Sequence, residues 1–148
     1  IDGYDTTGAN ILIALHACDT ATDDAIAKGI DAHADLIVVA PCCHKQIRRE
    51  MEKNKATNDQ DFLLKYGTFL ERQAEMVTDG LRALILEYSG YTTKVFEFIS
   101  DAHTPKNVLI VATRTNKPAD KAALLAKIKA AKSAYGIGQH YLERYIKL

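Results

Sequence analysis

The chain has no excess of charge of either sign, because 19 Lys and Arg residues balance 19 Asp and Glu residues. No overall electric field therefore favours nucleic acid as a partner. The three cysteines have no regular spacing, which excludes a disulfide framework and favours a reducing compartment, the cytoplasm. The uninterrupted apolar runs are no longer than a typical strand, so we expect no contact with a membrane.

Glycine-rich turns are also missing where a cofactor-binding sheet would have one. None of Gly3, Gly8, Gly136 and Gly138 directly follows an apolar strand. Such a turn lets the backbone approach a phosphate or a nucleotide closely. This sequence therefore lacks that means of holding a nucleotide-like cofactor.

Two short apolar stretches carry the reactive side chains of this sequence. Ile11–Leu15 and Leu36–Ala40 read as strands buried on both faces, which is typical of a parallel sheet, and residues 22–29 supply the crossover helix. Ligands of such sheets bind at the edge where the strands end. We therefore expect one cluster at that edge, formed by His16, Cys18, Asp19, Cys42, Cys43 and His44. This concentration of reactive groups indicates an enzyme or a part of one.

The rest of the chain predicts an α/β fold with an antiparallel end. A basic helical piece over residues 45–55 precedes a helix-start box at residues 57–60. One long helix should follow, because apolar positions alternate three and four apart: Leu70, Ala74, Val77, Leu81, Leu84 and Tyr88. The helix should end at Ser89-Gly90, since glycine commonly follows the last helical turn.

Two further strands, over residues 94–99 and 107–112, should form an antiparallel hairpin, because the loop of residues 100–106 is short. A final helix should open at Lys117-Pro118 and close near Gly136. Residues 140–148 should form one more short helix.

Several blocks of this sequence resemble one known family. The blocks are residues 16–23 (HACDTATD), residues 41–45 (PCCHK), and residues 97–100 leading to 103–107. Together they resemble the C-terminal half of a class I S-adenosylmethionine-dependent methyltransferase-like domain, in a family with LHACDxATD and APCCHK motifs. The resemblance runs from Ile11 to Arg114. It implies the C-terminal half of a Rossmann-like sheet, with two parallel strands, a long helix and an antiparallel hairpin in which the final strand inserts between its neighbours.

The same resemblance implies a division of the chain. Residues 1–114 would be a partial methyltransferase-like domain without its N-terminal cofactor-binding half, and residues 115–148 a basic C-terminal helical extension. We therefore expect a fragment that binds S-adenosylmethionine weakly or not at all and is itself inactive. The strand at residues 11–15 would have an open edge, which predicts self-association.

The resemblance also implies roles for individual residues. Leu15, His16 and Ala17 would line the methyl donor. Asp19, Cys43 and His44 would be catalytic, with Asp19 as the proton acceptor. The methyl acceptor, of unknown identity, would contact Thr22, Asp23, Cys42, Lys45, His103, Lys106 and Asn107. A looser likeness to a tRNA acceptor-stem 2′-O-methyltransferase makes RNA one candidate acceptor.

Each of these roles has a structural alternative. Asp19, Thr22 and Asp23 are also suited to capping the following helix, and free cysteines are commonly small buried hydrophobes. Because neighbours in an extended segment point to opposite faces, at most one of Cys42 and Cys43 should face the cleft. A zinc site formed by His16, Cys18, Cys43 and His44 lacks any C-x-x-C pair, so we predict no metal.

Two other functions remain open at this stage. Residues 115–148 carry seven Lys and Arg against two acidic residues. This basic segment is either a solvated helix face or a contact with an anionic partner. The chain could thus be a non-catalytic methyltransferase-like module that docks protein or RNA. A metal- or redox-sensing thiol site is the third hypothesis.

Overall fold

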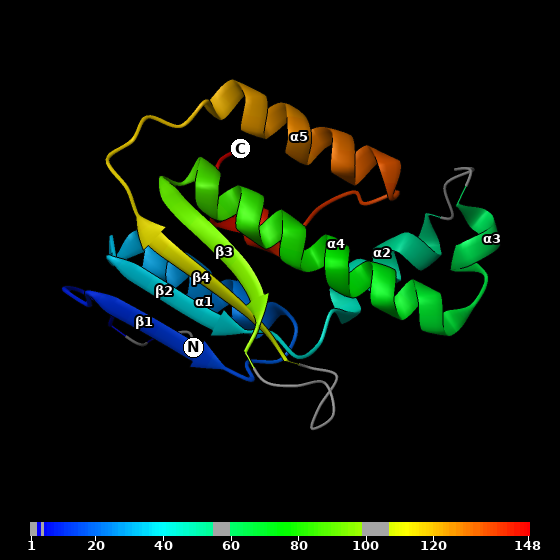
Figure 1. The fold of residues 1–148 in the computed structure, drawn as a ribbon, viewed down its shortest axis with the longest axis horizontal. Coiled ribbons are helices and arrows are strands. Elements are labelled where there is room, and N and C mark those ends of the chain that lie inside the picture. The colour runs from blue at the N-terminus through cyan, green and yellow to red at the C-terminus, as the bar shows by residue number, and fades with distance from the viewer. Residues whose placement is uncertain (1–2, 4, 55–59, 99–106) are drawn as a thin grey trace.

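The computed structural model describes residues 3, 5–54, 60–98 and 107–148, and its centre is a four-stranded sheet. The strands are β1 (Ile11–Leu15), β2 (Leu36–Ala40), β3 (Tyr91–Glu97) and β4 (Val108–Arg114), in the order β1-β2-β4-β3 (Figure 1). β1 and β2 are parallel, and β4 lies antiparallel between β2 and β3. The predicted parallel pair and the predicted antiparallel pair are both confirmed. The ends of β1, β2 and β3 therefore meet at one edge of the sheet.

The helices are α1 (Thr20–Asp31), α2 (Lys45–Lys53), α3 (Asp61–Leu64), α4 (Gly67–Tyr88) and α5 (Lys121–Ala134), followed by a 3-10 helix, η1 (Tyr141–Arg144). None of the described helices combines the length and the apolar composition needed to cross a membrane.

Two of the predicted helices have other bounds in the structure. The long helix is divided, because the turn closed by the Tyr66 N–H and the Leu63 carbonyl separates α3 from α4. The predicted start box at residues 57–60 lies almost wholly outside the described residues. The last long helix starts at Lys121, where the Asp120 side chain accepts a hydrogen bond from the Ala123 N–H, and not at Lys117-Pro118. The short helix predicted for the tail is present as the 3-10 helix η1.

Helices α1 and α4 cover the same face of the sheet. Directly paired residues share a face, and one such row consists of Leu12, Ile37, Ala112 and Thr93. Gly29 of α1 lies so close to this row that a Cβ there would stand 2.7 Å from Cδ1 of Ile37. At the other end of the row, the Thr93 hydroxyl donates to Glu87 of α4. The core therefore lies between this face and the two helices.

The opposite face is largely uncovered. Ile11, Ile13 and Leu15 point to that side of β1 and are 58%, 62% and 59% exposed. β1 is also the edge strand, so the backbone groups on its outer side have no neighbouring strand among the described residues. An apolar strip and a free strand edge therefore lie together, and both are suited to a further segment of protein.

The apolar stripe of α4 is confirmed in its first four members. Leu70, Ala74, Val77 and Leu81 are buried, whereas Leu84 and Tyr88 are only half-buried. The segment after residue 115 belongs to the same core, to which it contributes Ile128, Ile137 and Leu142. It therefore forms an integral layer of the fold over α4 and α1.

Candidate functional site

The loops that follow β1 and β2 lie side by side at the edge of the sheet. The His16 N–H donates to the Ala40 carbonyl over 3.1 Å, which extends the strand pairing by one step. The β1 loop then turns sharply, because His16 and Asp19 have φ angles of 58° and 51°. These values are unusual for residues other than glycine, and they persist only where surrounding contacts hold them.

Three contacts hold the β1 loop in this conformation. The Thr22 hydroxyl donates to the Ala17 carbonyl over 2.5 Å. Arg82 of α4 donates from Nη2 to the Asp19 carbonyl over 2.9 Å, and the Gln46 N–H of α2 donates to Asp19 Oδ1 over 3.1 Å. The loop is thus tied to α1, α2 and α4 at the same time.

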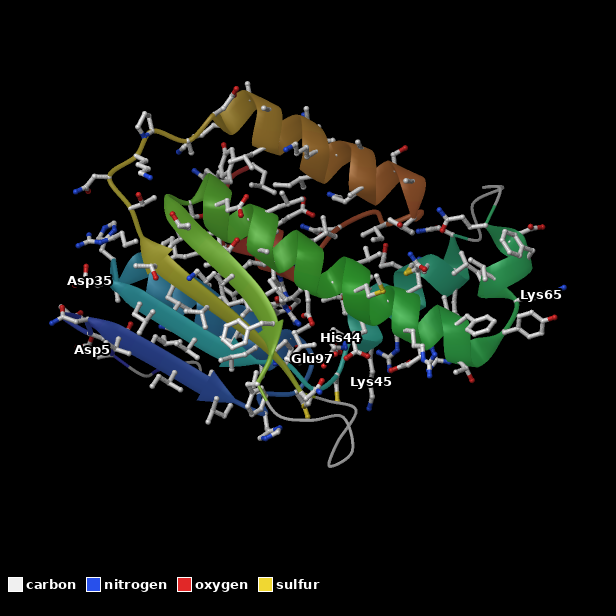
Figure 2. The ribbon with its side chains drawn as sticks, in the orientation of Figure 1. Asp5, Asp35, His44, Lys45, Lys65 and Glu97 are labelled. Carbon is white, nitrogen blue, oxygen red and sulfur yellow. The ribbon has the colours of Figure 1, made fainter. Side chains whose placement is uncertain are left out.

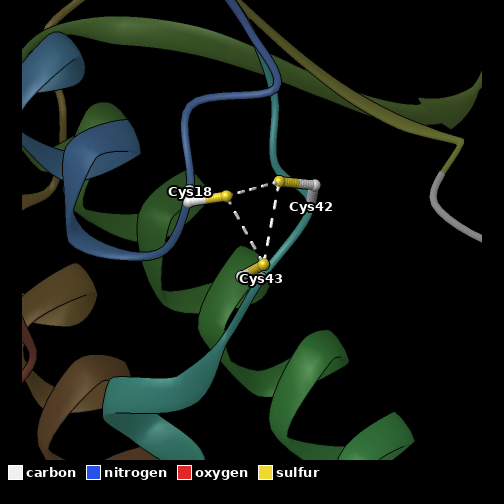
Figure 3. A group of neighbouring side chains, drawn as sticks. All are labelled: Cys18, Cys42 and Cys43. Atoms are coloured by element: carbon white, nitrogen blue, oxygen red, sulfur yellow. Dashed lines mark hydrogen bonds between the residues drawn. The ribbon is translucent and has the colours of Figure 1, made fainter.

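The thiols of Cys18, Cys42 and Cys43 form a compact group, which we call the thiol triad (Figure 3). The Sγ–Sγ distances are 3.4 Å for Cys18–Cys42, 3.7 Å for Cys18–Cys43 and 3.8 Å for Cys42–Cys43. The expectation that only one of Cys42 and Cys43 faces the cleft is therefore wrong. Because β2 ends at Ala40, the alternation of side chains does not extend to these two residues.

A buried charged group, which we call the Arg82 network, lies behind this edge. The Arg82 guanidinium holds Asp23 with two hydrogen bonds, of 2.8 and 3.1 Å, and donates to Asp79 over 3.0 Å. Both oxygens of Asp79 lie 3.2 Å from Nε2 of His44. All four side chains are almost fully buried. The network therefore links α1, the β2 loop and α4.

The network shifts the pKa values of its members. Burial disfavours the charged form of Arg82, but Asp23 and Asp79 outweigh it, so the pKa of Arg82 is raised and the side chain stays cationic. Burial raises the pKa of Asp23 against the opposing effect of Arg82. In the thiol triad, burial and then hydrogen bonds with the two neighbouring thiols raise the pKa of Cys42 to about 12. The Cys42 thiol alone is thus a poor nucleophile at neutral pH.

Several predicted site residues are buried and take part in bonds within the fold. Thr22 and Asp23 bond to Ala17 and Arg82, and His44 bonds to Asp79. Asn107 is also buried, next to β4. Thr22 and Asp23 are therefore bonded within the fold, but not as the caps of α1 that the structural alternative assumed. His103 and Lys106 lie outside the described residues.

Other predicted site residues remain accessible. Leu15 and His16 are exposed, and Ala17 and Asp19 are half-buried. Lys45 extends toward solvent at the start of α2, whereas its neighbour His44 lies against α4 (Figure 2). Asp19 does not cap α1 through its side chain, as the structural alternative assumed, but contacts the first turn of α2.

Sequence reasoning did not identify Asp79 and Arg82. The signal was present, because these charged residues lie within the otherwise apolar side of α4, between Val77 and Ile85. A charged residue in a buried helix stripe requires a partner of opposite charge. The partner, Asp23, is 59 residues away, and only the fold brings it close to Arg82.

A groove of about 1150 Å³ extends from this region toward β3. Its walls include Arg48, Asp79, Val95 and Asn107. Arg48 at its rim donates to Glu71 over 2.8 Å. The groove is large enough for a small molecule or for part of a polymer.

Comparison with known proteins gives one family match. Residues 4–50 match a family model described as a methyltransferase domain. The matched segment contains β1, α1, β2, the start of α2 and the whole thiol triad. No curated protein and no solved structure was found to match the chain. The similarity therefore indicates a methyltransferase-like domain, and the matched range includes the loops described above.

Proposed function

We propose that this chain supplies the C-terminal part of an S-adenosylmethionine-dependent methyltransferase domain. The observation that carries the proposal is the match of residues 4–50 to a methyltransferase domain, since it spans the two loops that form the candidate site. The strand order gives separate support, because β4 lies antiparallel between β2 and β3, as expected from the resemblance.

The uncovered side of the sheet supports the view that donor binding needs a further segment. Ile11, Ile13 and Leu15 are exposed beside the free edge of β1. Additional strands paired to β1, with helices over this face, would bury these side chains and would supply a glycine-rich turn. In the absence of such a segment, a second copy of the chain is the expected occupant of the same edge.

The accessible residues fit the proposed roles in methyl transfer. S-adenosylmethionine would supply an electrophilic methyl group on a sulfonium, so the protein mainly has to orient donor and acceptor in line. Leu15, His16 and Ala17 would line the donor. Asp19 would take the proton from the acceptor's nucleophilic atom as the new bond to the methyl carbon forms. Arg82 would position Asp19 through its hydrogen bond to the Asp19 carbonyl.

RNA is the acceptor class that we propose. It is supported by exposed lysines on α5, among them Lys121, Lys127 and Lys129. Phosphate contacts of this kind weaken steeply with salt. Binding of a short structured RNA should therefore fall as salt rises and should weaken further in a Lys127→Ala, Lys129→Ala variant.

The test is S-adenosylmethionine binding by calorimetry. We expect no binding by this chain and clear binding by a version extended upstream along its gene. An Asp19→Asn change in the extended protein should preserve donor binding and slow methyl transfer. If the extended protein does not bind the donor, the methyltransferase proposal fails, and a non-catalytic docking module becomes the better explanation.

A further inference from the structure

The thiol triad is the feature that the proposed function leaves unused. Methyl transfer as described above requires none of the three thiols. Their grouping nevertheless depends on two loops that lie 24 residues apart in the sequence. We propose that Cys18, Cys42 and Cys43 together bind one Zn²⁺ ion as thiolates. The three thiol protons pass to solvent as the zinc–sulfur bonds form, and the fourth tetrahedral position is left for water or a small exogenous ligand.

The distances between the sulfur atoms support this proposal. Zinc–thiolate bonds are about 2.3 Å long, so two sulfurs on one tetrahedral zinc lie about 3.8 Å apart. The three observed separations, 3.4, 3.7 and 3.8 Å, are close to that edge length. The thiols therefore already stand near three corners of a zinc tetrahedron.

The chemistry of the donor set also favours zinc. Thiolates are soft ligands that select zinc, copper(I) or iron–sulfur clusters over magnesium and calcium. Three protein ligands and one open position are typical of reactive zinc sites, whereas purely structural sites use four protein ligands. Cys18 is exposed, and Cys42 and Cys43 are half-buried, so an ion can reach the triad from solvent.

The surrounding structure holds the triad in place before any ion binds. Cys18 stands between His16 and Asp19, whose left-handed backbone is fixed by contacts to α1, α2 and α4. On the other loop, Cys43 precedes His44, which Asp79 anchors. Rigid support of this kind lowers the cost of ordering the ligands.

The proposed ligand set differs from the one considered on the sequence alone. That set combined His16 and His44 with two cysteines, and the expectation was that no metal binds. In the structure His44 is directed to Asp79 through Nε2, and Cys42 takes the third position in the cluster. The zinc proposal therefore rests on the three cysteines.

The experiment uses the full chain, reduced and stripped of metal, titrated with Zn²⁺ and in parallel with Co²⁺ under anaerobic conditions. We expect one equivalent of Zn²⁺ to bind, and we expect Co²⁺ to give thiolate-to-cobalt charge-transfer absorption together with the d–d bands of a tetrahedral site. Cys18→Ser and Cys42→Ser should each weaken zinc binding at least about tenfold. Cys18 is exposed, so its variant tests the proposal even if the Cys42 variant does not fold.

His33→Asn is the matched control. His33 is exposed and lies two residues after the end of α1, with a φ angle of 53°. Asparagine tolerates this backbone conformation, so the substitution should not disturb the fold. This variant should bind zinc as the natural chain does. The proposal is overturned if the reduced chain takes up less than one equivalent, or if both serine variants bind zinc with unchanged affinity. Because no methyl donor is present, failure here is distinct from failure of the methyltransferase proposal.

Discussion

His140 makes the stability of this protein depend on pH in a way that can be calculated. Its side chain is fully buried, and Nδ1 accepts a hydrogen bond from the Leu142 N–H over 3.2 Å. Burial, and next the positive charge of Arg82, lower the pKa of His140 to about 3 from an ordinary value of 6.5. In the folded protein the imidazole therefore stays neutral at every pH above about 3.

The sign of the effect follows from this difference. Below pH 6.5 the unfolded chain takes up a proton at His140 that the folded chain does not, so folding stability falls as the pH falls. Each pKa unit corresponds to about 1.36 kcal/mol, and pH 5 lies one and a half units below the unfolded value. Between pH 7.5 and pH 5, His140 should therefore cost about 2 kcal/mol of unfolding free energy.

The assay compares urea unfolding of the natural chain and of His140→Asn at several pH values from 7.5 to 5. Asparagine can still accept the hydrogen bond from the Leu142 N–H but does not titrate. The natural chain should lose about 2 kcal/mol more than the variant over this range. A difference between the two proteins that stays constant with pH would refute the reasoning, since His140 would then titrate alike when folded and unfolded.

Five further substitutions test the fold by urea unfolding or sedimentation. Arg82→Met should cost about 3–5 kcal/mol because it leaves two buried carboxylates without a cation, whereas the more exposed Arg48→Met should cost under about 1 kcal/mol. Little difference between these two would contradict the Arg82 network. Gly29→Ala should destabilise by about 1–3 kcal/mol through its contact with β2, and Gly80→Ala, where a Cβ meets nothing within 4 Å, should be neutral or stabilising. Ile13→Lys should shift the chain toward monomer in sedimentation, and a natural chain that is already monomeric would remove the case for self-association through β1.

Much of the sheet could be predicted because its signals are local. The apolar runs at residues 11–15 and 36–40 are strands within the same bounds. The crossover helix between them is also present, and it is four residues longer than the predicted segment 22–29. The antiparallel end of the sheet followed from the shortness of one connection. The convergence of the two cysteine-bearing loops was also foreseeable, because the carboxyl ends of parallel strands share an edge.

The roles of individual side chains at that edge were less predictable. Thr22, Asp23 and His44 were expected to meet a ligand, yet each is buried and bonded to another part of the protein. Asp23 and Arg82 differ greatly in sequence position, so no local pattern reveals that one neutralises the other. The pattern of one helix can indicate that a charged side chain is buried, but it does not identify the oppositely charged residue on another helix that pairs with it.

The sequence by itself determined the strands at residues 11–15 and 36–40, their shared edge, and the first four buried positions of α4, because each depends on a pattern within a short segment. Only the tertiary structure decided that Cys18, Cys42 and Cys43 form one triad and that His44 is excluded from it. The side-chain alternation that orients residues in a strand ends with β2 at Ala40. Beyond that point the directions of Cys42, Cys43 and His44 are set by the contacts of the loop with α4 and with the β1 loop, and these contacts exist only in the folded chain.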